Sequence, residues 1–262
     1  MTHLDLFSGI GGFALAARWA GFETIGFCEI DKYCQKVLKK NFPDVPIYED
    51  VTKLNGNQFK DIYLLTGGFP CQDISLAGKG AGIEGKRSGL WSELFRIISE
   101  VRPKYALIEN VPALTIRGGT RVIGDLTAIG YDTEWQIVGA DDVGAPHRRK
   151  RIWIVAYSNS GFSKRENKGI FAGRNSADNG SKEVPNPTNE RCRLRSIFGR
   201  NENRRRPSSN ALQSGEGRFE KWAVEPSICR VVDGLPNRVD RLRGLGNAIV
   251  PQVAYEIMRL LK

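Results

Sequence analysis

Histidine and paired cysteines are scarce in this chain, whose 262 residues include two histidines and five cysteines. The cysteines form no C-x-x-C pair and stand at Cys28, Cys34, Cys71, Cys192 and Cys229. Structural zinc sites need closely spaced Cys and His ligands, and a disulfide framework is typical of short, cysteine-rich secreted chains. We therefore expect no metal site and no disulfides, but reduced thiols of the kind found in cytosolic proteins.

Long apolar runs are also missing, and none approaches the ~20 residues needed to span a bilayer. The first residues, Met1–Phe7, show no basic region followed by a long apolar stretch, which is the pattern of a secretion signal. The expectation is a cytoplasmic protein with no membrane partner.

Acidic residues are fewer than basic ones, with 29 Asp and Glu against 39 Lys and Arg, so the net charge is +10. Such a balance favours a polyanionic partner, because phosphate groups attract Lys and Arg. A basic surface that serves solubility alone is an equally open interpretation at this point.

Apolar runs that look like strands alternate with helical patterns through the first 158 residues. The predicted strands are His3–Phe7, Thr24–Glu29, Asp61–Thr66, Lys104–Glu109, Asp132–Val138 and Arg151–Tyr157. Between them, Asp31–Asn41 begins with a capping Asp, and Ser88–Val101 carries apolar residues near a period of 3.6. This alternation predicts a doubly wound, mostly parallel α/β sheet whose parallel strands are joined by helical crossovers.

The composition changes after residue 158. Ser160–Arg206 holds twelve Lys and Arg against five Asp and Glu, and it is rich in Asn, Ser, Gly and Pro. A disordered basic linker is one interpretation. Scattered apolar residues favour the other, a small irregular domain over residues 159–232. Residues 233–262 are then a C-terminal segment, in which the helical pattern Pro251–Leu261 returns to the main sheet.

A glycine-rich turn, Asp5–Phe13, follows the first predicted strand and precedes a helix. Glycines let a ligand approach the backbone at the carboxyl end of a strand, where open α/β sheets bind ligands. Glu29 ends the second strand, where an acid can accept hydrogen bonds from both hydroxyls of a ribose. Asp50 follows a possible short third strand, within reach of an adenine amine. The spacing is not G-x-G-x-x-G, so a dinucleotide is disfavoured, but the three features together favour a nucleotide site.

Cys71 stands in the stretch GGFPCQDIS, directly after the apolar run Ile62–Leu65. An exposed thiolate with a lowered pKa is a good nucleophile, and a cysteine just past a strand faces the crevice rather than the core. Glu109 ends a later strand at the same rim of the sheet. The sequence thus predicts a nucleophile and an acid beside the nucleotide site. For Cys28, Cys34, Trp19, Trp91, Trp135 and Trp153, we expect core packing.

Taken in order, these motifs resemble those of the DNA (cytosine-5) methyltransferases, in the form found in prokaryotes and phages. The matching segments are Asp5–Phe13, Glu29, Asp50, Gly67–Ser75, Glu109–Val111, Gly144–Arg151 and Gly246–Pro251. One departure is His147, which stands where the family usually shows Gln, although Arg149 and Arg151 are kept. Residues 159–232 occupy the place of the family's variable target-recognition region.

The resemblance implies a Rossmann-like, class I S-adenosylmethionine-dependent fold with a small target-recognition domain, and it assigns site residues by position. The implied catalytic residues are Cys71, Glu109, Arg149 and Arg151. The implied cofactor-binding residues are Phe7, Gly9, Gly11, Gly12, Glu29, Ile30, Asp50, Val51, Pro70, Asn247 and Ala248. The implied DNA-binding residues are Gln72, Ser75, Lys79 and Arg87.

The implied reaction adds the Cys71 thiolate to C6 of a cytosine rotated out of duplex DNA, so that C5 accepts a methyl group from S-adenosylmethionine. Glu109 would hold N3 and the exocyclic amine, while Arg151 would anchor the base and keep Glu109 ionised. The stretch Gln72–Ser88 has the glycines and basic residues of a loop that closes on phosphates. No metal is implied, the expected protein is a monomer, and a cognate restriction endonuclease could act separately.

Two alternatives remain open. One is methylation of cytosine in transfer RNA by a related branch, although the Cys-Phe-Thr signature associated with that branch is absent from the sequence. The other is a DNA-binding pseudoenzyme, which the intact Cys71, Glu109 and Arg151 disfavour.

Overall fold

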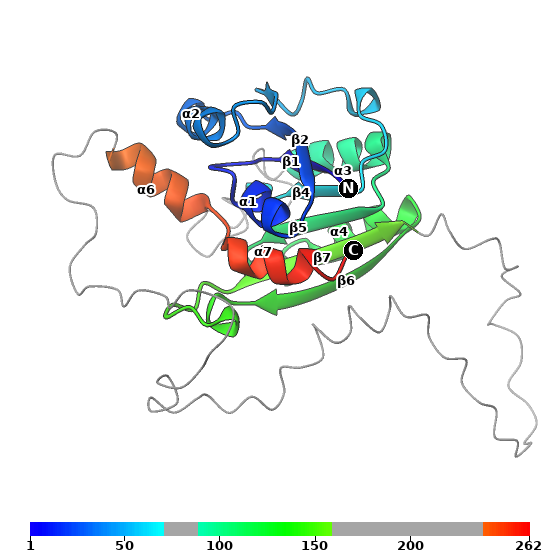
Figure 1. The fold of residues 1–262 in the computed structure, drawn as a ribbon. Coiled ribbons are helices and arrows are strands. Elements are labelled where there is room, and N and C mark those ends of the chain that lie inside the picture. The colour runs from blue at the N-terminus through cyan, green and yellow to red at the C-terminus, as the bar shows by residue number, and fades with distance from the viewer. Residues whose placement is uncertain (71–88, 159–237) are drawn as a thin grey trace, which may run out of the picture.

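The structure is a computed structural model that describes residues 1–70, 89–158 and 238–262. These residues form a seven-stranded sheet in the order β3-β2-β1-β4-β5-β7-β6, with helices on both faces (Figure 1). The strands are β1 (Thr2–Leu6), β2 (Glu23–Cys28), β3 (Ile47–Tyr48), β4 (Leu64–Gly67), β5 (Tyr105–Asn110), β6 (Tyr131–Val138) and β7 (Arg151–Ser158). The helices are α1 (Gly12–Trp19), α2 (Lys32–Asn41), α3 (Leu90–Val101), α4 (Gly119–Ala128), α6 (Arg238–Asn247) and α7 (Pro251–Met258).

All six predicted strands are present, with their ends shifted by a few residues, and the neighbours from β3 through β5 pair in parallel. The prediction of a mostly parallel sheet is confirmed, and the exception is β7, which pairs antiparallel with both β5 and β6. The connection from β6 to β7 holds the short 3-10 helix Asp141–Val143 and no crossover helix. A chain that turns back without a crossover must enter an adjacent strand in the opposite direction. The sheet is therefore mostly parallel with one reversed strand.

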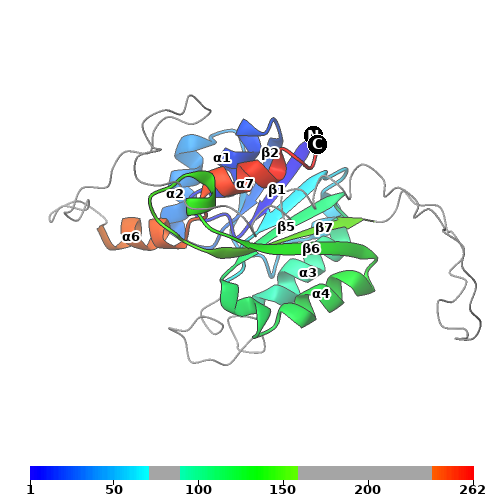
Figure 2. The same cartoon turned by 90° about the horizontal axis from the view of Figure 1, so that it is seen from below.

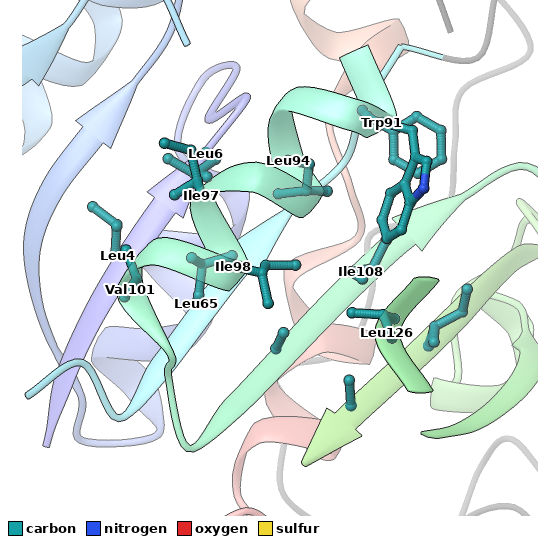
Figure 3. Close-up of a cluster of buried hydrophobic side chains, with 14 of the residues drawn as sticks. Leu4, Leu6, Leu65, Trp91, Leu94, Ile97, Ile98, Val101, Ile108 and Leu126 are labelled. Atoms are coloured by element: carbon teal, nitrogen blue, oxygen red, sulfur yellow. The ribbon is translucent and has the colours of Figure 1, made fainter. Parts of the chain in front are cut away.

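The core lies on both faces of the sheet because successive strand residues point to opposite sides. On one face, Leu4 and Leu6 of β1 pack with α3 and α4, and Figure 3 shows Leu94, Ile97 and Ile98 of α3 lying over the strands. On the other face, α1 and α7 cover β4, β5 and β7 (Figure 2). Strands buried on both sides read as near-continuous apolar runs, which is why the sequence reveals them.

The capping residue predicted for α2 and the apolar stripe predicted for α3 are both present. The Asp31 carboxylate caps α2 by accepting hydrogen bonds from the N–H groups of Tyr33 at 2.9 Å and Cys34 at 3.0 Å. Helix α3 buries its apolar stripe and is capped after Val101 by Arg102, whose φ of 53° is left-handed. Ser88, the first residue of the predicted helix, lies outside the described residues.

Helix α7 packs against α1 and so returns the chain to the main sheet, as predicted. Trp91 and Trp153 are buried, and so are Cys28 and Cys34, which confirms their core packing. The same prediction is wrong for two tryptophans. Trp19, in the last turn of α1, is 45% exposed and meets Tyr255 edge to face, while Trp135 on the edge strand β6 is 47% exposed.

The predicted small domain, residues 159–232, lies outside the described residues, as does the loop Gln72–Ser88. Of the C-terminal segment, residues 238–262 are described and form α6 and α7. In the described ranges, none of the helices has the length and apolar character of a membrane span.

Candidate active site

A cavity of about 550 Å³ opens at the carboxyl ends of the parallel strands, within the size range of small-molecule sites. Phe7 follows β1, Glu29 follows β2, Gly68 follows β4, and Glu109 lies at the end of β5. The end of α6 supplies the facing wall with Arg243, Gly244, Gly246 and Asn247. This is the edge at which open α/β sheets bind ligands, because the strand ends and the loops after them form a crevice there.

Eight of the predicted cofactor-binding residues line this cavity. They are Phe7, Gly9, Glu29, Ile30, Asp50, Val51, Pro70 and Asn247. Gly11, Gly12 and Ala248 are not among the lining residues, although they lie beside it in sequence. Arg243, Gly244 and Leu90 line the cavity without having been predicted.

The glycines of the Asp5–Phe13 turn serve two different purposes. Gly9 has a φ of 53°, and a Cβ placed on it would meet nothing within 4 Å, so the backbone there is open to a ligand. Gly11, with a φ of 89°, lies against Leu38 and Phe42, and a Cβ on Gly12 would come within 2.7 Å of Ile249 Cγ1. Gly11 and Gly12 therefore allow α1 to pack closely on its neighbours.

We predict that Gly12→Ala lowers the free energy of unfolding by about 1–3 kcal/mol, because the added methyl group overpacks the contact with Ile249. Gly124→Ala in α4 is the matched control, since a Cβ there meets nothing within 4 Å. That control should raise stability by roughly 0.5–1 kcal/mol, the advantage of Ala over Gly inside a helix. Denaturant unfolding of both variants checks the pair, and equal effects would contradict the packing role of Gly12.

Two backbone N–H groups hold the carboxylate of Glu29 at the cavity wall. Gly9 donates to Oε2 at 2.7 Å, and Asp31 donates to Oε1 at 2.8 Å. Burial raises the pKa of Glu29, and these hydrogen bonds oppose the rise. Each carboxylate oxygen keeps a further lone pair, so the oriented side chain can accept hydrogen bonds from two adjacent hydroxyl groups.

Asp50 lies at the rim of the same cavity, after β3. Its Oδ1 accepts hydrogen bonds from the Thr52 N–H at 2.9 Å and from the Thr52 hydroxyl at 2.7 Å. These bonds, with the hydroxyl contact the largest cause, lower the pKa of Asp50. The group is thus a fixed, ionised acceptor suited to an amine.

Glu109 and Arg151 form an ion pair in the cavity, with Arg151 Nε 2.9 Å from Glu109 Oε1. Glu109 is the last residue but one of the parallel strand β5, and its ladder partner on β7 is Trp153. Because β7 runs antiparallel, its first residue, Arg151, lies at the edge where β5 ends. The reversal of β7 is therefore what brings the guanidinium to the acid.

Burial raises the pKa of Glu109 to about 7, although the charges of Arg151 and Arg149 oppose the rise. The charge of Arg151 favours the ionised acid, whereas desolvation, the larger effect, favours the protonated form. Near neutral pH the carboxyl group is present in both forms. It can act as a hydrogen-bond donor through its proton or as an acceptor.

Gly68 and Asn110 fix the chain that leads to Cys71. A Cβ on Gly68 would lie 3.2 Å from Glu109 Oε2, so a glycine allows close approach of the loop to the acid. The Asn110 amide donates to the Phe69 carbonyl at 3.1 Å, two residues before Cys71. Gly68 thus fits a loop pressed against the end of β5, whereas Gly67 lies in β4 and makes room for Leu94 of α3.

Arg149 lies outside the lining of the cavity. Its Nη2 donates to the carbonyl oxygens of Gly246 and Ala248, each at 2.6 Å, behind the cavity wall formed by the end of α6. His147 lies in the same β6–β7 connection and is half-buried. Of the remaining predicted residues, Cys71, Gln72, Ser75, Lys79 and Arg87 lie outside the described residues. Within the described ranges, no group of three or more His, Cys, Asp or Glu could hold a metal ion.

The sheet order and the cavity at its carboxyl edge are those of a Rossmann-like methyltransferase. A solved structure in this class is a putative DNA modification methyltransferase encoded within an E. coli prophage, which superposes with a TM-score of 0.52 at 30% identity. The superposition covers 61% of this chain and 47% of that chain. The chain belongs to the C-5 cytosine-specific DNA methylase family, whose sequence model matches residues 1–225.

Curated relatives in this family include type II methyltransferases of bacteria and of a virus. The chain is 39% identical over 164 residues to the type II methyltransferase M2.BsuMI of Bacillus subtilis (strain 168), covering 60% of this chain and 42% of that protein. It is 36% identical over 163 residues to the type II methyltransferase M.HhaI of Haemophilus parahaemolyticus, covering 61% of this chain and 50% of that protein. The chain spans about half the length of the curated relatives it matches.

Proposed function

We propose that this protein transfers a methyl group from S-adenosylmethionine to C5 of a cytosine rotated out of duplex DNA, through a covalent bond between Cys71 and C6 of the base. The observation that carries the proposal is that the Glu109–Arg151 ion pair and the oriented Glu29 carboxylate share one cavity. Pro70, at the edge of that cavity, directly precedes Cys71. Membership of the cytosine-specific DNA methylase family supports the choice of base and of nucleic acid.

The residues present fit S-adenosylmethionine. Gly9 leaves open space at the glycine turn, Glu29 can accept hydrogen bonds from both ribose hydroxyls, and Asp50 can accept one from the adenine amine. Asn247 closes the facing wall. When bound, the cofactor supplies an electrophilic methyl group on a sulfonium sulfur.

The protein's own groups would activate the base. Cytosine C5 is a poor nucleophile because the ring is electron-deficient, and addition of the Cys71 thiolate at C6 converts the ring into an enamine. Protonated Glu109 can donate to N3 while its other oxygen accepts from the exocyclic amine, so negative charge that builds up on the ring is stabilised. Arg151 holds Glu109 in place and anchors the base. After methylation, transfer of the C5 proton to water and expulsion of the Cys71 thiolate would restore the aromatic ring.

Residues 159–232 would select the DNA target, and the four positions Gln72, Ser75, Lys79 and Arg87 would contact DNA. Support for this comes from their place in the family pattern and from the excess of basic residues in Ser160–Arg206. The protein would work as a cytoplasmic monomer. A cognate restriction endonuclease that acts separately fits the type II methyltransferase names of the relatives.

The test of the function is incubation of the full chain with labelled S-adenosylmethionine and either duplex DNA or transfer RNA. Label that appears as 5-methylcytosine in DNA alone supports the proposal. Label in transfer RNA alone supports the alternative RNA activity. Nucleic-acid binding with no transfer to either substrate supports the pseudoenzyme alternative.

We predict that Glu29→Ala weakens S-adenosylmethionine binding by about 10- to 100-fold, the loss expected for hydrogen bonds to a charged group. DNA affinity should change far less, because Glu29 lies on the side of the cavity assigned to the ribose. Calorimetric titration with cofactor and with DNA measures both. Glu23→Ala is the control, since Glu23 is exposed at the opposite end of β2 and should bind cofactor like the wild type. A larger loss of DNA affinity than of cofactor affinity in Glu29→Ala would refute the ribose assignment.

A further inference from the structure

The Arg149 side chain binds the main chain on both sides of Asn247. Its Nη2 donates to the Gly246 carbonyl and to the Ala248 carbonyl, each at 2.6 Å. Asn247, between these two carbonyls, lines the cavity, whereas Arg149 and Ala248 do not. The Arg149 guanidinium thus holds the backbone around Asn247 from outside the cavity.

The backbone of Arg149 is itself held in an unusual conformation. Its φ of 33° is positive, which non-glycine residues rarely adopt unless their surroundings enforce it. The preceding carbonyl, of Arg148, accepts a hydrogen bond from the Ala140 N–H at 2.7 Å. Two residues later the chain enters β7 at Arg151, which pairs with Glu109. The chain is therefore anchored at Arg148 and at Arg151, and the Arg149 side chain between them points to the end of α6.

The end of α6 is also tied to the opposite side of the cavity. Arg243 forms an ion pair with Asp31, whose N–H donates to Glu29 at 2.8 Å. Ile249, after α6, packs on Gly12. The segment that carries Asn247 is therefore held at two points. Arg243 links it through Asp31 to the Glu29 side of the cavity, and Arg149 holds it on the side of the Glu109–Arg151 ion pair. Arg149 supplies its link to the β6–β7 connection.

We propose that Arg149 is a positioning residue that holds Asn247 in the wall of the cofactor cavity and thereby supports cofactor binding. The identity of the ligand as S-adenosylmethionine rests on the proposed function. Neutral apolar replacement removes both donated hydrogen bonds, and the carbonyls of Gly246 and Ala248 then lose the contact that sets the backbone around Asn247.

The test is calorimetric titration of S-adenosylhomocysteine, the demethylated cofactor, in the absence of DNA. Arg149→Met should weaken its binding by about 10- to 30-fold, the effect of losing hydrogen bonds to a charged donor. Arg259→Met, directly after α7, is the matched control, since Arg259 pairs with Glu256 of that helix; it should bind like the wild type. Unchanged affinity in Arg149→Met, with a loss of turnover at saturating cofactor, overturns the inference because it places the action of Arg149 at the base.

A double-mutant cycle with Asn247→Ala separates positioning from a general structural role. If Arg149 acts through Asn247, Asn247→Ala should cost much less affinity in the Arg149→Met background than in the wild type. Additive losses overturn the inference. Should Arg149→Met fail to fold, Arg149→Lys decides by the same titration, since it keeps the charge but has a shorter reach. A loss of affinity supports the proposal, and wild-type affinity contradicts it.

These outcomes are distinct from a failure of the proposed function. Wild-type protein that binds S-adenosylhomocysteine but methylates no nucleic acid contradicts the proposed reaction, while the comparison of Arg149→Met with wild type still tests the inference. Wild-type protein that does not bind S-adenosylhomocysteine contradicts the cofactor assignment and the inference together.

Discussion

Cys71→Ala should abolish methyl transfer, lowering the single-turnover rate by at least about 10⁴-fold, which is the scale of losing an essential nucleophile. The physical reason is that the cytosine ring gains a nucleophilic C5 only after a thiolate has added at C6. Alanine cannot form that bond, so the base remains electron-deficient even when the cofactor and Glu109 are in place. Rapid-quench measurement with labelled S-adenosylmethionine gives the rate.

The same variant supplies its own control. Cys71→Ala should bind S-adenosylhomocysteine nearly as the wild type does, since the described cavity wall at Glu29, Asp50 and Asn247 is untouched. Turnover retained in Cys71→Ala with normal cofactor affinity would rule out the covalent mechanism.

Glu109→Gln should lower the transfer rate by about 10²–10³-fold, the effect of removing a preorganised group that stabilises charge in the transition state. The wild-type rate should also depend on pH in a way that the variant does not. Because the pKa of Glu109 is about 7, its carboxyl group carries a proton below that pH, which it would donate to N3 in the proposed reaction, and loses it above. The ratio of wild-type to Glu109→Gln rates should therefore fall as pH rises through about 7. Taking the ratio removes the ionisation of Cys71, which both proteins share.

Stability provides an independent check on the same group. The pKa of Glu109 rises from 4.5 to about 7 on folding, so in this window the folded protein holds a proton that the unfolded chain has released. The free energy of unfolding then decreases as pH rises through the window. Glu109→Gln removes this pH dependence. The free energy of unfolding of the variant, relative to that of the wild type, should therefore increase as the pH rises from 5 to 7. A pH-independent difference would show that the carboxyl group is ionised throughout.

The sequence predicts the strands and the residues at their ends because burial on both faces leaves continuous apolar runs, and polar residues stand where each run stops. The positions of Glu29, Asp50 and Glu109 at this edge of the sheet are predicted in this way. The direction of β7 could not be predicted, since an apolar run looks the same in either direction. That direction decides the site, because only an antiparallel β7 brings Arg151 to the end of β5.

The other features of the site that the sequence did not predict also have physical causes. A glycine that faces a ligand and a glycine that lets a helix pack look alike in sequence, so Gly9 could not be separated from Gly12. Arg149 and Arg151 stand two residues apart, yet the strained backbone at Arg149 sends its side chain behind the cavity wall. Arg243 was missed because its helix, α6, has a weak apolar pattern and follows a segment of irregular composition. Its signal was its place one helical turn before Asn247.

The measurement that tests the central claim most directly uses duplex DNA in which cytosines carry fluorine at C5. The fluorine cannot leave as a proton does, so a base that has been attacked at C6 and methylated at C5 stays attached to the enzyme. We predict a protein–DNA adduct that survives denaturation, forms only with S-adenosylmethionine, and maps by mass spectrometry to Cys71. Methyl transfer to ordinary DNA without any such adduct, or an adduct at another cysteine, would contradict the account.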